Sequence, residues 1–316
     1  MGADMMMPGR FMLSYRYMRM QMEENRIGTD EVSPEEIVTT VGNRFAPPPT
    51  LRVVPTEMTT QMHMLGAMYA PTDWLTLVAM ASYLEKSMDH VTFQGGAGTT
   101  RLGEFTTESS GIGDTKLAGL VRLYRQGRHQ LHANLGLSVP TGSIDEEDDV
   151  LAPTGARPTL RLPYPMQLGS GTVDLLPGLT YKGAAGAVGW GAQVLGTIRL
   201  GENDENYSFG DRVDLTAWGS YAWAPWVSTS LRLSGRHIGR IDGQDPEITA
   251  PVQTADPDFQ GGERVDLGFG VNLAGQDAGL RGARLGVEFG LPVYQDLNGP
   301  QLAGDWSITA GGKYMF

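Results

Sequence analysis

The sequence predicts an all-β protein, a transmembrane antiparallel β-barrel of about 12 strands with both termini in the periplasm. Segments of about ten or more residues recur in which apolar and polar side chains alternate, with turn residues between them. No apolar run approaches the ~18 residues that a membrane helix needs, so a membrane span in this chain has to be made of strands. The connections between the segments alternate between short and long, as they do in outer-membrane barrels.

The strands follow one another at regular intervals in a single domain. We expect them at 10–23, 56–70, 74–91, 112–125, 129–139, 172–182, 186–200, 210–224, 227–240, 263–274, 281–292 and 304–316. The long connections lie at 24–55, 92–111, 140–171, 201–209, 241–262 and 293–303, and they are expected to be extracellular because short turns face the periplasm. A soluble β-sandwich also alternates, but it does not need all of its long loops at one end. Residues 1–9 form a periplasmic tail, and 10–316 form the barrel.

The final strand, DWSITAGGKYMF, supports a bacterial outer-membrane location. Trp306, Ile308, Tyr314 and Phe316 share its apolar face. A chain that ends on Phe after such a strand resembles the C-terminal signal of bacterial outer-membrane proteins, whose apolar strand faces contact outer-membrane lipid. The first residues, MGADMMMPGRF, lack the basic and apolar regions of a secretory signal, so we expect a processed form.

The amino-acid composition excludes several classes of function. The chain has 316 residues, no Cys and a net charge of −12. Disulfides and cysteine-based metal or nucleophile chemistry are therefore excluded, and the acidic balance argues against nucleic acid as a partner.

Methionine is concentrated at the start of the chain, where 14 of the 16 Met residues precede residue 89. Many stand two residues apart, which places them on one face of a strand. Leu13, Tyr15, Leu65, Leu77 and Tyr83 occupy the opposite, lipid-facing side, so the methionines face the lumen. The candidate metal ligands on this luminal wall are Met18, Met20, Met22, Met58, Met62, Met64, Met88 and His90.

Three roles for this methionine wall remain open. Thioether sulfur selects Cu(I) or Ag(I) over hard cations, and acidic loop stretches such as DEEDD would concentrate cations at the mouth. Methionine also makes an adaptable path for apolar solutes, or it simply fills irregular space. No cofactor is certain from the sequence, and Cu(I) is the candidate ion.

The rest of the lumen is expected to be charged. One interpretation is a ladder that attracts or orients anions; the other is that these side chains pair with one another, since an unpaired buried charge is costly. The candidate pore-lining residues are Arg16, Lys86, Lys116, Arg122, Arg212, Asp214, Arg232, Arg236, Arg240, Arg264, Asp266, Arg284 and Glu288.

The sequence gives no catalytic constellation. Nucleophilic catalysis needs a Ser and a His within hydrogen-bond reach and a third group that orients the His. Only His63 and His237 are expected to face outward, and neither lies beside a Ser-Asn motif of the outer-membrane phospholipase kind. We therefore expect no enzyme.

The stretch SGIGDTKLAGLVRLYRQGRHQLHANLGLSVPTGS (110–143) resembles the core of the outer-membrane transporter family named for the phenol meta-degradation pathway. The matching positions are Gly111, Gly113 and Asp114, then Val139, Pro140, Thr141 and Gly142. The resemblance covers some 35 residues and implies a single-chain outer-membrane channel for hydrophobic aromatic solutes. The methionine wall is not part of the family pattern, which favours a subgroup with its own cargo.

The sequence thus predicts an outer-membrane channel or transporter, with soft metal ions as the first candidate cargo. The alternative is a channel for small hydrophobic or aromatic solutes. A second alternative is a structural barrel that binds a protein partner through its extracellular loops or its N-terminal tail. Loop 140–171 is long enough to fold inward as a plug.

Overall fold

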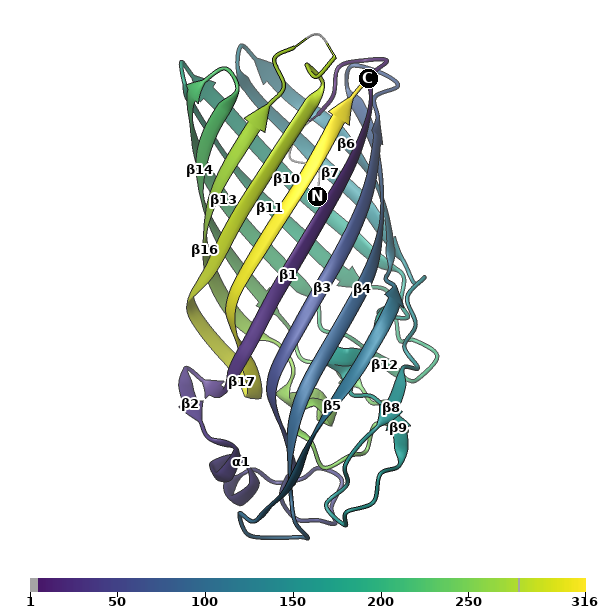
Figure 1. Ribbon diagram of the computed structural model, residues 1–316. Helices are drawn as coiled ribbons and strands as arrows, with labels where there is room; N and C mark the ends of the chain where they lie inside the picture. The colour runs from purple at the N-terminus through teal and green to yellow at the C-terminus, as the bar shows by residue number, and fades with distance from the viewer. Residues whose placement is uncertain (1–4, 278) are drawn as a thin grey trace.

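The computed structural model describes residues 5–277 and 279–316, which form a closed antiparallel β-barrel with tilted strands (Figure 1). Neighbours in the ring are neighbours in the chain, and β17 closes the ring by pairing with β1. The eleven strand elements of the ring are β1 Phe11–Gly28, β3 Val53–Tyr69, β4 Leu75–Phe93, β6 Thr115–Gln126, β7 His129–Val139, β10 Asp174–Ala185, β11 Val188–Arg199, β13 Arg212–Ala224, β14 Val227–Ile238, β16 Gly262–Ala274 and β17 Ala283–Met315.

The structure has eleven ring elements where about twelve strands were predicted, because the last two predicted strands are the two halves of one element, β17. Residues 284–297 of β17 pair with β16, and residues 301–315 pair with β1. The two parts run beside each other, since Gln295 Nε2 donates to Gly304 O at 3.0 Å and Phe289 stacks on Trp306. The predicted long loop at 293–303 is therefore part of the wall.

The remaining elements project from one end of the barrel, which we call the loop end (Figure 1). The predicted loops 24–55 and 92–111 are partly regular there: the first carries β2 and α1, and the second carries β5, which pairs with the outer part of β4. The elements at this end are β2 Asp30–Val32, α1 Pro34–Thr40, β5 Arg101–Ile112, β8 Glu147–Asp149, β9 Thr159–Arg161, η1 Tyr164–Met166, β12 Tyr207–Ser208, β15 Asp242–Gly243, η2 Gln253–Ala255 and η3 Pro257–Phe259.

The opposite end, the turn end, carries only short connections, and β1 begins and β17 finishes there. Apolar side chains cover the outside of the wall: Leu65 is 64% exposed and Leu285 is 60% exposed. In water such a surface would be unfavourable, whereas in a bilayer it faces acyl chains. No helix among the described residues is long and apolar enough to cross a membrane. The closed barrel places the protein in the bacterial outer membrane.

The loops at the loop end pack into a cap with its own apolar core. One cluster includes Phe105, Leu151, Tyr164, Tyr207 and Val252, and a second surrounds α1. These side chains come from loops that are distant in sequence, so the connections form one folded layer over the lumen.

Candidate functional site: the lumen and its plug

The predicted methionine wall exists as a row of luminal positions across β1, β3 and β4. Met22 pairs with Met58, and Met58 pairs in turn with Met88. Met18 pairs with Met62 two luminal rows nearer the turn end, beyond the pair of Met20 and Thr60. Directly opposed side chains on antiparallel strands share a face of the sheet, so these sulfurs line the same side of the lumen.

The eight candidate metal ligands do not form one site. Met22, Met58 and Met88 pack in a buried cluster with Leu162 and Met166, two residues of the long connection between β7 and β10. Methionine commonly fills irregular space of this kind.

The other candidate ligands lie in different surroundings. His90 is buried and stacks on Phe105 with ring centroids 4.7 Å apart. The Sδ atom of Met20 accepts a hydrogen bond from Arg264 Nη1 at 3.8 Å. The positive charge of this guanidinium disfavours binding of a metal cation at the same sulfur. Met18, Met62 and Met64 are partly exposed in the lumen.

Charged side chains cover β13, β14 and β16, roughly across the ring from β3 and β4. Asp214 accepts hydrogen bonds from Arg212 Nε at 2.6 Å and from Arg236 Nε at 2.9 Å. Arg264 Nε donates to Asp266 at 2.6 Å, and Arg232 pairs with Glu288. Most of these luminal charges are therefore paired, and the lumen has one wall rich in methionine and one rich in arginine and carboxylate.

Among the described residues, Arg16 is a cation of this region that forms no ion pair within 4.0 Å. It projects from β1, is exposed to the lumen, and interacts electrostatically with both Arg232 and Glu288. The charge of this region is therefore positive on balance, although the whole chain is acidic.

The other candidate pore residues are distributed along the barrel axis. Arg122 lies 3.5 Å from Asp73 at the turn end, and Arg284 lines a cavity there. Lys116 interacts electrostatically with Asp114 and Arg212. The placement of Arg240 in the wall was wrong, because β14 finishes at Ile238 and Arg240 is an exposed loop residue.

The connection between β7 and β10, residues 140–173, folds across the loop end of the lumen, and we call it the plug segment. Lys86 Nζ on β4 donates to Pro165 O at 2.7 Å and to Gln167 O at 2.6 Å. Ser109 Oγ on β5 donates to Met166 O at 2.6 Å. β4 of the wall and its neighbour β5 thus hold three consecutive residues of the plug segment by their backbone carbonyls.

Asp114 fixes both ends of the plug segment. Its Oδ1 accepts from Gly142 N at 3.1 Å, and its Oδ2 accepts from Ser170 N at 2.8 Å. At Gly142 a Cβ atom would lie 2.7 Å from Gly169 Cα, so the two ends of the segment approach each other only because both residues lack a side chain. Asp114 and Gly142 belong to the GxGD and VPTG elements noted in the sequence.

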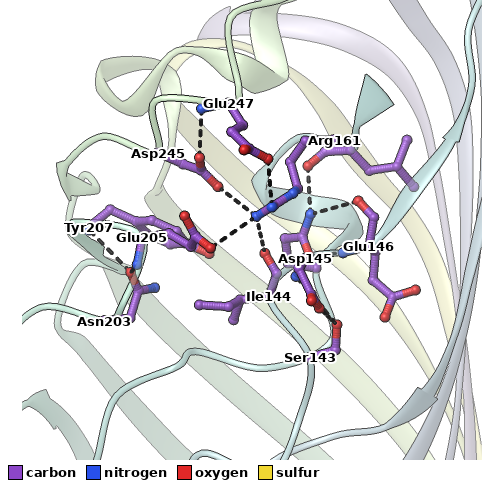
Figure 2. Close-up of polar contacts among 12 residues, drawn as sticks. Ser143, Ile144, Asp145, Glu146, Arg161, Asn203, Glu205, Tyr207, Asp245 and Glu247 are labelled. Atoms are coloured by element: carbon purple, nitrogen blue, oxygen red, sulfur yellow. Dashed lines mark hydrogen bonds and ion pairs between the residues drawn. The ribbon is translucent and has the colours of Figure 1, made fainter. Parts of the chain in front are cut away.

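An ion-pair network that sequence reasoning missed joins three loops of the cap (Figure 2). Arg161 of the plug segment lies 2.7 Å from Glu247, 3.3 Å from Asp245 and 3.5 Å from Glu205. Arg161 Nη1 also donates to Ile144 O at 3.4 Å. The carboxylates come from two other loops, and the sequence offered no signal that they would meet.

Burial controls the protonation of this network. Asp245 is fully buried, and burial raises the pKa of its carboxyl even though Arg161 acts to lower it. Burial also raises the pKa of Tyr164 to about 12, and its hydroxyl oxygen accepts from Asp245 N at 3.2 Å. The pKa of Arg161 is lowered by burial, but Asp245, Glu247 and Glu205 together raise it above its usual value.

The two outward histidines have partners other than serine. Tyr15 Oη lies 2.8 Å from His63 Nδ1, and Glu263 lies 3.4 Å from His237 Nδ1.

The predicted N-terminal tail does not extend away from the barrel along its whole length. Met6 is buried inside the barrel, while Met7 is exposed.

Comparisons with known proteins identify the fold. No family model matches the sequence, and no curated protein matches it. The structure is similar to the COG4313 outer membrane channel from Pseudomonas putida F1, with a TM-score of 0.63, 17% identity and coverage of 99% of this chain and 98% of the other. It also aligns with a Pseudomonas aeruginosa FadL homologue, with a TM-score of 0.48, 8% identity and coverage of 96% and 90%. The likeness to the COG4313 channel shows the fold of this chain, a closed β-barrel of the outer-membrane type.

Proposed function

We propose that the protein is an outer-membrane channel for small organic solutes with an apolar body, and that its loop end faces outside. The observation that carries this proposal is the pair of unlike luminal walls. Thioethers on β1, β3 and β4 offer adaptable apolar contacts, and the arginine-rich strands β13, β14 and β16 offer hydrogen-bond donors to polar substituents. A solute with one apolar and one polar side can contact both walls at once.

The cap and the plug segment control access to this lumen. The cap elements β2 and β5 continue the backbone ladders of β1 and β4. Residues 165–167 of the plug segment are held differently, by the side chains of Lys86 and Ser109. Side-chain contacts can open while the barrel stays closed, so the plug segment is the element whose movement would admit a solute. This function agrees with the channel named in the structural comparison and with the family resemblance, both of which concern outer-membrane channels.

Uptake into proteoliposomes tests the proposal. The purified barrel should admit benzyl alcohol or a nitrophenol faster than a polyol of equal size, because the polyol gains little from the methionine wall. A Met18→Ser, Met62→Ser variant should lose that preference, while Met18→Leu, Met62→Leu keeps it. Uptake rates that depend only on the size of the solute would indicate an unselective pore. No uptake of any solute would favour a structural barrel.

Soft-metal binding is the second candidate, and one observation favours it. Met58, Met88 and Met166 lie in a single buried cluster and Met22 packs against it, so up to four thioethers, which are ligands for soft ions, come from one region. Anaerobic Ag(I) titration of the parent and of a Met22→Leu, Met58→Leu, Met88→Leu variant tests it, since Leu keeps most of the volume. Tight binding lost only in that variant, and retained in Met18→Leu, Met62→Leu, would establish a site. Negligible binding in all three would leave the cluster as packing.

A further inference from the structure

The N-terminal segment enters the barrel at the turn end. Met6 is 4% exposed, and its backbone N–H donates to Thr76 Oγ1 at 3.2 Å. It packs on the luminal side chains of Met12, Met68 and Leu120. Gly9 N donates to Ala70 O at 2.8 Å, which anchors the segment to the end of β3. The segment therefore fills the side of the lumen formed by β1, β3, β4 and β6.

A cavity of about 400 Å³ remains between this segment and β17. That volume lies within the range of roughly 300–1,000 Å³ that small-molecule sites occupy. Four basic side chains line the cavity, those of Arg10, Arg281, Arg284 and Lys313, together with thioethers such as Met12 and Met315. No acidic side chain is among the described lining residues.

The arginines of the cavity keep donors available. Arg281 Nε donates to Gln276 O at 3.4 Å, and Arg284 Nη1 donates to Ala283 O at 3.2 Å. Both acceptors are neutral carbonyls. Within residues 5–277 and 279–316, no side-chain carboxylate forms an ion pair with Arg10, Arg281 or Arg284. Excess positive charge in a confined space lined by methionine favours an anion with an apolar body.

We propose that this cavity binds a small organic carboxylate at the turn end of the lumen. Its carboxylate would accept hydrogen bonds from the guanidinium groups of Arg281 and Arg284, since a planar guanidinium matches a carboxylate in two-point contacts. Its apolar body would lie among the methionines. This inference rests on the proposed function only in taking the ligand to be a conducted solute.

Binding of 4-fluorobenzoate, followed by ¹⁹F NMR on the purified barrel in a neutral detergent, tests the site. We expect saturable binding that weakens about tenfold in Arg284→Gln and Arg281→Gln, because each loses a charged hydrogen bond. Arg284→Lys should retain part of the affinity. The matched control is Arg240→Gln, which removes an exposed arginine at the loop end and should bind as the parent does.

The neutral probe 4-fluorobenzyl alcohol has the same ring without the carboxylate, so it measures how much of the affinity comes from the carboxylate charge. It should bind about tenfold more weakly than 4-fluorobenzoate. Equal affinity for the two probes, or parental affinity in the Arg284→Gln variant with the barrel still folded by circular dichroism, would overturn the proposal. Binding without uptake into proteoliposomes would leave the site in place and remove the channel function. Uptake without binding would support the channel function and overturn the proposed carboxylate site.

Discussion

Lys86 on β4 lies 2.7 Å from the carbonyl oxygen of Pro165, a residue 79 positions later that sits in the plug segment. The same ammonium donates to Gln167 O at 2.6 Å. An ammonium has three donors and no acceptor, so it can hold several carbonyls at once. This one side chain therefore links the barrel wall to the segment that crosses the lumen.

Replacing Lys86 by Met is expected to loosen the plug segment and to raise the single-channel conductance several-fold in planar bilayers. Two backbone carbonyls lose their charged donor, which costs on the order of 1–3 kcal/mol. Arg16→Met is the control, because it removes a luminal cation on β1 that forms no hydrogen bond or ion pair with the plug segment among the described residues. An equal rise in Arg16→Met would mean that lost charge, and not plug movement, changed the conductance.

Asp114→Asn should release the two ends of the plug segment. An amide keeps the shape of the carboxylate but offers only one acceptor oxygen, whereas Asp114 accepts from both Gly142 N and Ser170 N. One of these N–H groups would then face an amide NH₂ group. We expect faster hydrogen exchange across 140–173, by a factor corresponding to roughly 1–3 kcal/mol. Unchanged exchange in Asp114→Asn, or an equal change in the exposed-site control Asp204→Asn, would contradict this role.

The alternation of side chains predicted the faces of the wall because a strand's period of two is local information. It placed Met22, Met58 and Met88 on the lumen side correctly. It could not show what covers them, since Leu162 and Met166 come from a loop far along the chain. The same alternation assigned Arg240 to the lumen as part of the predicted strand 227–240. That assignment was wrong because β14 ends at Ile238, and side chains no longer alternate between two faces beyond the end of a strand.

The cap was the least predictable part of the molecule. Its contacts join loops through irregular backbone, for which no sequence period exists. Arg52 illustrates this: its fully buried guanidinium donates to the carbonyls of Gln94, Gly95, Ala97 and Gly98. The GxGD and VPTG elements were visible in the sequence, but only the structure shows that Asp114 and Gly142 meet.

Arg161→Met should destabilise the cap without opening the barrel. Removing the guanidinium leaves Asp245 buried without its cation, and breaking a buried ion pair in this way costs about 3 kcal/mol. Adding Asp245→Asn should recover part of the loss, because a neutral amide needs no cation. Hydrogen exchange in 239–261 measures the effect. Full additivity of the two substitutions would show that the pair is not coupled.

The contact between Glu35 of α1 and Arg101 of β5 should make the position of the helix depend on pH. Arg101 Nη2 lies 2.7 Å from Glu35, and the hydrogen bond from Arg101 lowers the pKa of this carboxyl. A carboxyl whose pKa is lowered in the folded state contributes stability above its unfolded pKa, and it loses this contribution as the pH falls through the lowered folded value. Both side chains are partly exposed, so the effect is small and is weakened by salt.

A spin label tests this directly, because the chain has no other Cys to react. Thr39→Cys places the label on the exposed side of α1. We expect the label to become more mobile as the pH falls below the ordinary range of a glutamate, and to regain its restricted motion when the pH is raised again. In an Arg101→Gln background the label should already be mobile at neutral pH and should change little on acidification. Equal acid-induced mobility in both backgrounds would assign the transition to other carboxylates of the cap, since only the parent carries the ion pair whose loss is being measured.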